Sequence, residues 1–418
     1  MSGAGLKGRV SRVFPALKQR NFRYFWLGQC ISLIGSWIQT TAQQWLVYTM
    51  TKSALLLGLL GVAQFGPIML LSLFAGVFVD RYPKKRMLIF TQTCLTIQAL
   101  VLAVLVWLGH IAYWEVLLLA AFMGLVNTLD LPTRQSLLPQ LVPKKDLRSA
   151  IGLNSAIVNV ARILGPALAA LLMVQFGAGF LFFLNAISFI PVLVGLHLIK
   201  LKPENIINAE KRVLAGVRDG LAYIHRSSIL LGAVFSMLAI GTFVMNFSVV
   251  IPLYAVEVLK RGIHGYAFLL SASGTGSLLG ALLVASWAKG NPRLRLLLGS
   301  AFLVSGLLLF LRNIHTLPLA IGMFVMIGFV NIIFITTANS TVQLNTEDRY
   351  RGRVMSVYSF AFSGTTPIGN LFAGAVTQWW GAGMGFFLCG AASAFFLLLT
   401  VLGLGLKLRK RSSFDRSS

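Results

Sequence analysis

Acidic residues are scarce in this sequence, whose 418 residues contain 11 Asp and Glu against 36 Lys and Arg. Charged residues of both signs make up 11% of the chain, whereas soluble domains contain about 25%. Apolar residues make up 57%, and the mean hydropathy is +0.80. This composition excludes an ordinary water-soluble domain and indicates a chain that folds in a membrane.

Cysteine and histidine are also few, with three and five residues. Cys30, Cys94 and Cys389 fall within apolar runs, and the sequence has no CxxC pair or Cys/His cluster, so neither a disulfide framework nor a metal site is indicated. Ser/His/Asp arrays and nucleotide-binding motifs are also lacking. We therefore expect no cofactor, no metal and no enzyme activity.

Long apolar runs dominate what is present. Runs of about 20 residues can cross about 30 Å of hydrocarbon as helices. The sequence therefore predicts an all-α membrane protein with twelve transmembrane helices, at residues 23–48, 54–79, 86–108, 113–135, 149–176, 179–199, 228–256, 265–288, 294–312, 317–343, 354–378 and 383–406.

The basic residues follow the loops on one side of these runs. Those that lie elsewhere are Lys52, Arg162, Lys260, Arg261 and Arg312. Such a bias follows the positive-inside rule and does not indicate a nucleic-acid partner. Residues 1–20 do not have the pattern of a secretory signal. We therefore expect a multi-pass protein of the bacterial cytoplasmic (inner) membrane with both termini cytoplasmic.

The runs divide into two sets of six at the longest polar segment. Segments KKDLRSAIGLNSAIVNVARILGPALAA and TEDRYRGRVMSVYSFAFSGTTPIGNLFAG align on Pro166 and Pro367, which indicates an internal repeat. We expect two six-helix pseudo-repeat bundles around a central cavity. The predicted divisions are an N-terminal segment 1–22, a first bundle 23–199, a linker 200–227 with an amphipathic helix, a second bundle 228–406 and a tail 407–418.

A charged loop, GVFVDRYPKKR, separates the second and third runs. It resembles the G-x-x-x-D-R-x-G-x-[RK]-[RK] signature of the major facilitator superfamily, with Pro83 in place of the usual glycine. The resemblance implies a gating loop in which Asp80 is a latch near the cytoplasmic start of span eleven. A carboxylate at a helix N-terminus is stabilised by about 0.3–2 kcal/mol. The gating-loop residues are Gly76, Asp80, Arg81, Lys84 and Lys85.

Four other segments resemble the branch of this superfamily that contains the enterobactin exporter and macrolide efflux pumps, which are drug:proton antiporters. They are NFRYFWLGQCISLIGSWIQTTAQQWLVY, DLPTRQSLLPQLVP, ARILGPALA and RGRVMSVYSFAFSGTTPIGN. The resemblance implies export of a hydrophobic or amphiphilic small molecule, such as a siderophore, macrolide or other drug, by alternating access with protons as the second partner. The alternatives are a transporter of lysophospholipid or another solute, and a non-transporting receptor or scaffold. We expect a monomer whose other partner is membrane lipid.

Ionisable residues near or within the spans are functional candidates because a charge in hydrocarbon is costly unless it is paired or hydrated. Asp130, Arg134 and Arg162 are predicted to form a charge network, either as a structural tie or with Asp130 as a proton carrier. Glu257, near the end of span seven, is a second possible proton carrier.

Uncharged polar residues mark a possible substrate cavity. Ser32, Ser36, Gln39 and Gln43 follow one face of span one, which should not face lipid. The resemblance implies that spans one, four, seven and ten line the cavity, which adds Asn127, Asn246, Asn331 and Asn339. The alternative for each residue is interhelical hydrogen bonding without substrate contact.

Overall fold

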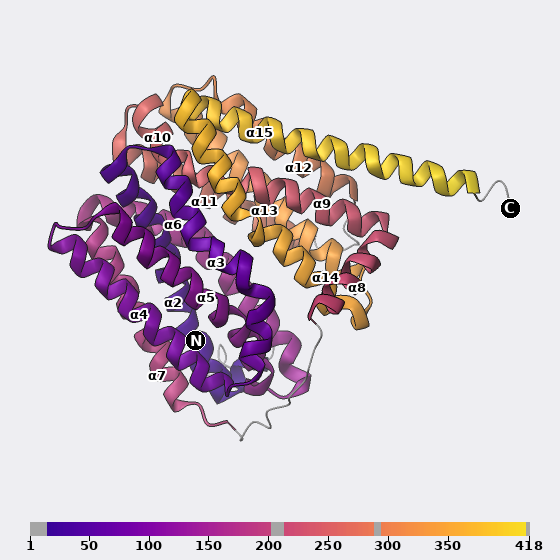
Figure 1. Ribbon diagram of the computed structural model, residues 1–418, viewed down its shortest axis with the longest axis horizontal. Coiled ribbons are helices and arrows are strands. Elements are labelled where there is room, and N and C mark those ends of the chain that lie inside the picture. Colours follow the sequence, from indigo (N-terminus) through magenta and orange to yellow (C-terminus); the bar gives the residue numbers. More distant parts are fainter. Residues whose placement is uncertain (1–14, 202–212, 288–293, 415–418) are drawn as a thin grey trace, which may run out of the picture. The chain divides into compact units, whose positions relative to one another are not determined.

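The computed structural model describes residues 15–201, 213–287 and 294–414, and all the regular secondary structure of these residues is helical (Figure 1). Parts of the predicted N-terminal segment, linker and tail lie outside the described residues. The longer helices are α2 (Arg20–Thr51), α3 (Ala54–Asp80), α4 (Lys84–Trp107), α5 (Tyr113–Leu141), α6 (Leu147–Ser188), α7 (Ile190–Leu198), α8 (Val213–Arg226), α9 (Ser228–Phe243), α11 (Gly262–Trp287), α12 (Leu294–Leu311), α13 (Leu317–Leu344), α14 (Asp348–Ser359) and α15 (Thr366–Phe414).

Shorter elements connect these helices. They are the 3-10 turns η1 (Pro15–Lys18), η2 (Lys144–Asp146) and η3 (Met245–Val249), the short helix α10 (Ile251–Leu253), and the π-helical turns η4 (Tyr254–Val258) and η5 (Phe360–Gly364). Turns of the π type interrupt the regular hydrogen-bond ladder and occur frequently at functional sites.

Eight helical segments of the described residues are long and apolar enough to cross a membrane, or nine if the bent pair α8 and α9 is one span. This confirms an all-helical membrane fold. Two of the eight segments, residues 149–198 and 349–405, contain a sharp bend at Gly177 and Gly381, where φ is 73° and 80°. No atom lies within 4 Å of a Cβ added at either glycine, so the backbone conformation itself requires glycine there.

The chain forms two compact units. The first contains residues 1–43 and 70–210, and the second contains residues 44–69 and 211–418. In the first unit α4 packs against α5 and α6. A buried apolar cluster joins η1 and the start of α2 to the end of α5, the start of α6 and α7, and it includes the fully buried residues Phe22, Leu137, Ala150 and Leu196.

Close backbone contacts organise the second unit. A Cβ added at Gly276 of α11 would meet the carbonyl oxygen of Val325 at 1.9 Å, and one added at Gly328 of α13 would meet that of Ser273 at 2.0 Å. Small residues allow helix backbones to approach in this way where lipid gives no hydrophobic drive for association. In the same unit, a Cβ added at Gly58 of α3 would lie 2.5 Å from the carbonyl oxygen of Asn370 in α15.

Helix α8 of the second unit packs against α14. The rings of Tyr223 and Tyr350 stack with centroids 4.5 Å apart, and Asp219 pairs with Arg353 at 2.8 Å. Of the apolar residues on α8, Ile224 is buried and Leu221 is exposed. Of these two positions of the apolar stripe, one is therefore packed and the other is open.

Candidate functional site

A buried carboxylate lies between α4 and α5 in the first unit. Asp130 of α5 is 2% exposed, and its Oδ1 accepts hydrogen bonds from Thr91 Oγ1 and Gln92 Nε2 of α4, each at 2.6 Å. Its Oδ2 pairs with Nε of Arg134, one helical turn further along α5. Together these four residues form the Asp130 cluster, which ties two neighbouring helices through charge-assisted bonds.

The hydrogen bonds of the Asp130 cluster could be arranged in a second way. Thr91 Oγ1 also lies 3.1 Å from the carbonyl oxygen of Leu88, although a hydroxyl group has a single proton to donate. Arg134 Nη1 and Gln92 Oε1 are buried without a hydrogen-bond partner among the described residues. Buried polar groups without partners are costly and are typical of sites with a function beyond packing.

Sequence reasoning identified Asp130 and Arg134 but missed Thr91 and Gln92. Both lie in the predicted span 86–108. Two adjacent polar residues within a span were the one feature of the sequence that could have indicated a buried partner for Asp130. The structure places Arg162 of α6 with its guanidinium over the ring of Trp37, 5.8 Å from the ring centroid. This is the geometry of a cation–π contact.

The charged loop between α3 and α4 contains Arg81, which is exposed. Gly76 and Asp80 lie outside the residues whose side chains the structure describes, so the latch stays a prediction. Lys84 Nζ donates to two backbone carbonyls near the end of α3, at 3.0 and 3.1 Å.

Lys85 binds the end of another helix in the same unit. Its Nζ donates to the carbonyl oxygen of Ile199 at 2.7 Å and to that of His197 at 3.4 Å, where α7 ends. A cation is favoured at a helix C-terminus, where carbonyl groups have no partner within the helix. This contact fixes the start of α4 against α7.

Gln39 lies in a network of side-chain amides inside the first unit. It is fully buried, its Nε2 donates to Gln98 Oε1 at 2.9 Å, and its Oε1 accepts from Asn185 Nδ2 at 2.7 Å. Gln98 in turn donates to a backbone carbonyl of α5 at 3.2 Å. These bonds favour the interhelical alternative for Gln39 over a place on the cavity wall.

The other polar residues of span one differ from Gln39. Ser36 Oγ donates to the carbonyl oxygen of Ser32 at 2.8 Å. Ser32 Oγ is buried without a partner among the described residues, and Gln43 is fully buried.

The predicted cavity residues of the later spans also have different environments. Asn246 is buried and donates to the carbonyl oxygen of Gly241 at 3.1 Å, and Asn339 Oδ1 accepts from Gln343 Nε2 at 2.7 Å. Asn127 is half-buried. Asn331 is half-buried, with its Oδ1 buried and without a partner in the described part of the chain.

Glu257 lies in the π-helical turn η4, just beyond the predicted seventh span, and is exposed. Partial burial raises the pKa of the Glu257 carboxyl above its ordinary value, and the charge of Lys260 opposes this shift. In the same unit the ring of Trp45 stacks on that of Tyr266 at 5.1 Å.

A family model described as transmembrane secretion effector matches residues 11–418. Among curated proteins the chain is similar to the Staphyloferrin A transporter of Staphylococcus aureus, with 27% identity over 84% of this chain and 87% of the relative. It is also similar to the multidrug efflux pump Tap of Mycolicibacterium fortuitum (25%, covering 82% and 86%) and to macrolide efflux protein A of Streptococcus pyogenes (21%, covering 88% and 92%).

Solved structures of transporters share the fold. Nucleoside transporter NupG superposes with a TM-score of 0.67 at 12% identity, covering 92% of this chain and 98% of that one. A bacterial homologue of the human lysosomal transporter Spinster, in an inward-facing and unoccupied conformation, gives 0.67 at 13% identity, covering 93% and 96%. At such low identity these similarities concern the fold alone.

Proposed function

Because this chain belongs to the transmembrane secretion effector family of the major facilitator superfamily, we propose that it exports a hydrophobic or amphiphilic small molecule, driven by protons. The observation that carries the proposal is similarity along most of the chain to relatives named as a staphyloferrin A transporter, a macrolide efflux protein and a multidrug efflux pump. Siderophores, macrolides and other drugs are therefore the proposed substrate classes.

The proposed architecture has twelve spans. Segments 149–198 and 349–405 contain 50 and 57 residues, and helices of that length would extend about 75 and 85 Å at 1.5 Å per residue. The hydrocarbon core is only about 30 Å thick, so each segment should cross twice, turning at Gly177 and Gly381. With α2 and α9 the count becomes twelve, and the basic loops then favour cytoplasmic termini in the inner membrane.

Alternating access is supported by the division of α2 and α3, each of which contributes residues to both units. Residues 44–69 continue the chain of the first unit but pack in the second. There, glycines of α3 meet α15: a Cβ added at Gly61 would lie 2.0 Å from Asn370 Nδ2, and one added at Gly374 would lie 2.7 Å from the carbonyl oxygen of Ala54. We assign this glycine-lined contact to a gate on the side away from the termini, opposite the Asp80 loop.

Proton coupling is assigned first to the Asp130 cluster. When Asp130 is ionised, Thr91 Oγ1 donates a hydrogen bond to Oδ1. When Asp130 is protonated at Oδ1, the carboxyl can donate a hydrogen bond to Thr91 Oγ1, and the Thr91 hydroxyl can donate to the Leu88 carbonyl oxygen 3.1 Å away. The Thr91 hydroxyl can thus bond the carboxyl group in both protonation states without movement of the helices. Glu257 is the second candidate because of its raised pKa.

The substrate surface is assigned to polar atoms that the helices leave unused. Ser32 Oγ and Asn331 Oδ1 are buried without partners among the described residues, and Asn127 is half-buried. Such groups gain hydrogen bonds when a polar portion of a ligand reaches them. Asn246 and Asn339 already form hydrogen bonds within the protein, and we propose that they bind the ligand by exchanging these bonds for bonds to it.

Accumulation measurements in a host without major efflux pumps test the proposal. Cells expressing the protein are loaded with a labelled macrolide, siderophore or lysophospholipid, and Asp80→Asn serves as the gating control. We expect lower accumulation of at least one macrolide or siderophore with the wild type than with Asp80→Asn. Changed lysophospholipid content alone would favour the alternative transporter, and no effect on any compound would favour a receptor or scaffold.

A further inference from the structure

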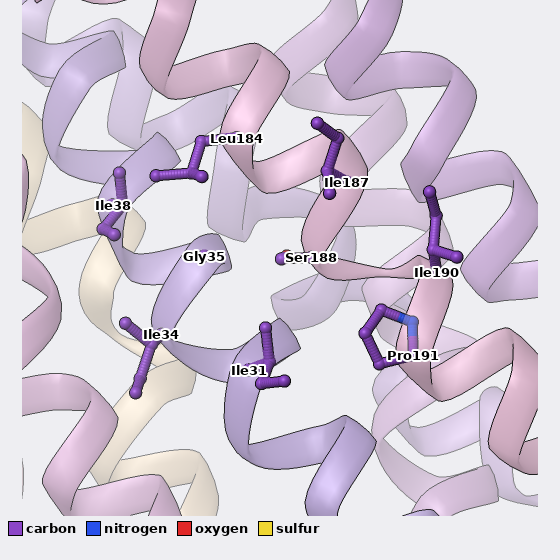
Figure 2. A pocket seen from close by; sticks show the side chains of 9 residues that line it. All are labelled: Ile31, Ile34, Gly35, Ile38, Leu184, Ile187, Ser188, Ile190 and Pro191. Carbon is purple, nitrogen blue, oxygen red and sulfur yellow. The ribbon is translucent and has the colours of Figure 1, made fainter.

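A continuous apolar groove runs along the first unit between α2 and the junction of α6 with α7. It consists of two hollows of about 380 and 220 Å³ that share Ile31 and Pro191. In the larger hollow Ile31, Ile34 and Ile38 of α2 stand opposite Leu184, Ile187 and Ile190, with Gly35 and Ser188 between the rows (Figure 2). Ser188 donates its hydroxyl proton to the carbonyl oxygen of Asn185 at 2.7 Å, so the larger hollow has an apolar lining.

Backbone contact between the helices fixes the shape of the groove. A Cβ added at Gly28 would meet the carbonyl oxygen of Pro191 at 2.8 Å, and one added at Gly195 would meet that of Tyr24 at 2.8 Å. The side chains beside this contact stand free, since Ile31 is 51% and Ile190 50% exposed. The groove is therefore a concave surface of the first unit whose floor is set by backbone contact.

The length of the groove matches one leaflet of a bilayer. Along α2 the lining runs from Tyr24 to Ile38, which corresponds to a rise of about 21 Å at 1.5 Å per residue. The hydrocarbon of one leaflet is about 15 Å deep, half of the full core. The remainder reaches the headgroup region, where tyrosine is commonly found.

Positive charge is concentrated at the Tyr24 end. Arg20 Nε donates to the Tyr24 hydroxyl at 3.0 Å, and Lys200 is held beside the start of α2 because its carbonyl oxygen accepts from Asn21 Nδ2 at 2.9 Å. Arg20 and Lys200 are both exposed, and neither has an ion pair with a carboxylate of the described residues. An apolar slot that ends at two unpaired cations is complementary to an anionic amphiphile.

We propose that this groove binds an anionic phospholipid, with one acyl chain along Ile31, Ile34 and Ile187 and the phosphate at Arg20 and Lys200. The binding site does not depend on the proposed function. Because Arg20 and Tyr24 lie near the N-terminus, the proposed cytoplasmic location of the termini assigns the site to the cytoplasmic leaflet, and only this assignment rests on the proposed function. The zwitterionic lipids of the same leaflet match the apolar lining equally well but not the cationic end.

Native mass spectrometry of the purified full chain tests this site. The protein, in a neutral detergent, is titrated with phosphatidylglycerol or with phosphatidylethanolamine carrying the same acyl chains. We expect one phosphatidylglycerol molecule to bind with higher affinity than phosphatidylethanolamine. The double variant Arg20→Gln/Lys200→Gln should lose about fivefold in phosphatidylglycerol affinity for each removed charge and leave phosphatidylethanolamine binding unchanged.

Groove-filling variants test the acyl-chain site separately. Ile31→Trp and Ile187→Trp should weaken binding of both lipids about tenfold or more, because the larger side chains occupy the space of the acyl chain. The matched controls are Leu118→Trp, at an apolar position of α5 that is 60% exposed, and Lys144→Gln/Lys145→Gln at exposed cations of η2, and both should bind as the wild type does. Size-exclusion profiles identify variants that do not fold. If only one of the two tryptophan variants folds, that variant alone tests the acyl-chain site.

Two results would overturn the proposal. One is equal affinity for the two lipids that none of the groove or charge variants changes. The other is a dimer mass that disappears in Ile31→Trp, because a second copy of the chain would then occupy the groove.

Discussion

Asp130→Asn should destabilise the first unit strongly. The carboxylate is 2% exposed and Arg134 has a side chain only 10% exposed, so the substitution removes one member of a buried ion pair. The asparagine Oδ1 can still accept from Thr91 and Gln92. Its amide nitrogen, however, would face the guanidinium of Arg134, and two donors cannot satisfy each other.

The size of the effect follows from the buried charge left behind. Removal of one partner of a buried pair costs about 3–5 kcal/mol, which is a large share of the roughly 5–15 kcal/mol by which proteins are stable. For a unit of this size, about 2–4 °C of melting temperature corresponds to each kcal/mol. We therefore expect a decrease of roughly 6–20 °C.

Thermal unfolding of the purified variants in one detergent measures this decrease. The double variant Asp130→Leu/Arg134→Met, which removes both charges, should melt higher than Asp130→Asn, because an apolar replacement leaves no unpaired charge. Asp219→Asn is the matched control. It breaks the Asp219–Arg353 pair, whose side chains are 52% and 42% exposed, and exposed pairs contribute about 0–1 kcal/mol.

A wild-type melting temperature for Asp130→Asn would refute the structural part of this reasoning. If that variant is stable and its export no longer depends on pH, Asp130 acts as a proton carrier without holding α4 to α5. If it is stable and transports normally, the Asp130 cluster has neither role.

Two further predictions concern the second unit. Gly61→Leu should lower the melting temperature and abolish transport, because overpacking costs about 1–3 kcal/mol and an added Cβ would lie 2.0 Å from Asn370 Nδ2. Gly152→Ala, where no atom lies within 4 Å of an added Cβ, should leave both unchanged. Burial raises the pKa of the Glu257 carboxyl, so around this pKa the folded state binds more protons than the unfolded chain. The contribution of Glu257 to the free energy of unfolding therefore falls as pH rises above the pKa that this carboxyl has in the unfolded chain. Glu257→Gln should flatten that slope in melting temperatures measured from about pH 4 to 7, and an unchanged slope would contradict it.

Features that depend on local sequence were predictable. Apolar length and the positions of loops indicate an all-helical membrane fold, which the structure and the family match confirm. Gly276 and Gly280 lie one helical turn apart, a spacing typical of close helix contacts in membranes, and added Cβ atoms there would meet backbone carbonyls of α13 at 1.9 and 2.6 Å. Small residues at regular spacing have few other uses inside a membrane helix.

Partners across helices were not predictable in the same way. Thr91 and Gln92 bond Asp130 from 39 and 38 positions away, and Asn185 bonds Gln39 from 146 positions away. Helical periodicity identifies the face on which a residue lies but not which neighbouring helix covers that face. For this reason the polar stripe did not reveal that Gln39 forms hydrogen bonds with Gln98 and Asn185 inside the first unit.

Transport into inside-out vesicles tests the central claim of proton-driven export most directly. Vesicles containing the protein receive a labelled macrolide or siderophore exported in the cell assay, with and without an acidic lumen that drives protons outward. Proton-driven export predicts accumulation that requires the gradient, collapses when a protonophore is added and is lost in Asp80→Asn. Accumulation that is equal with and without the gradient, or equal to that in vesicles lacking the protein, would contradict it.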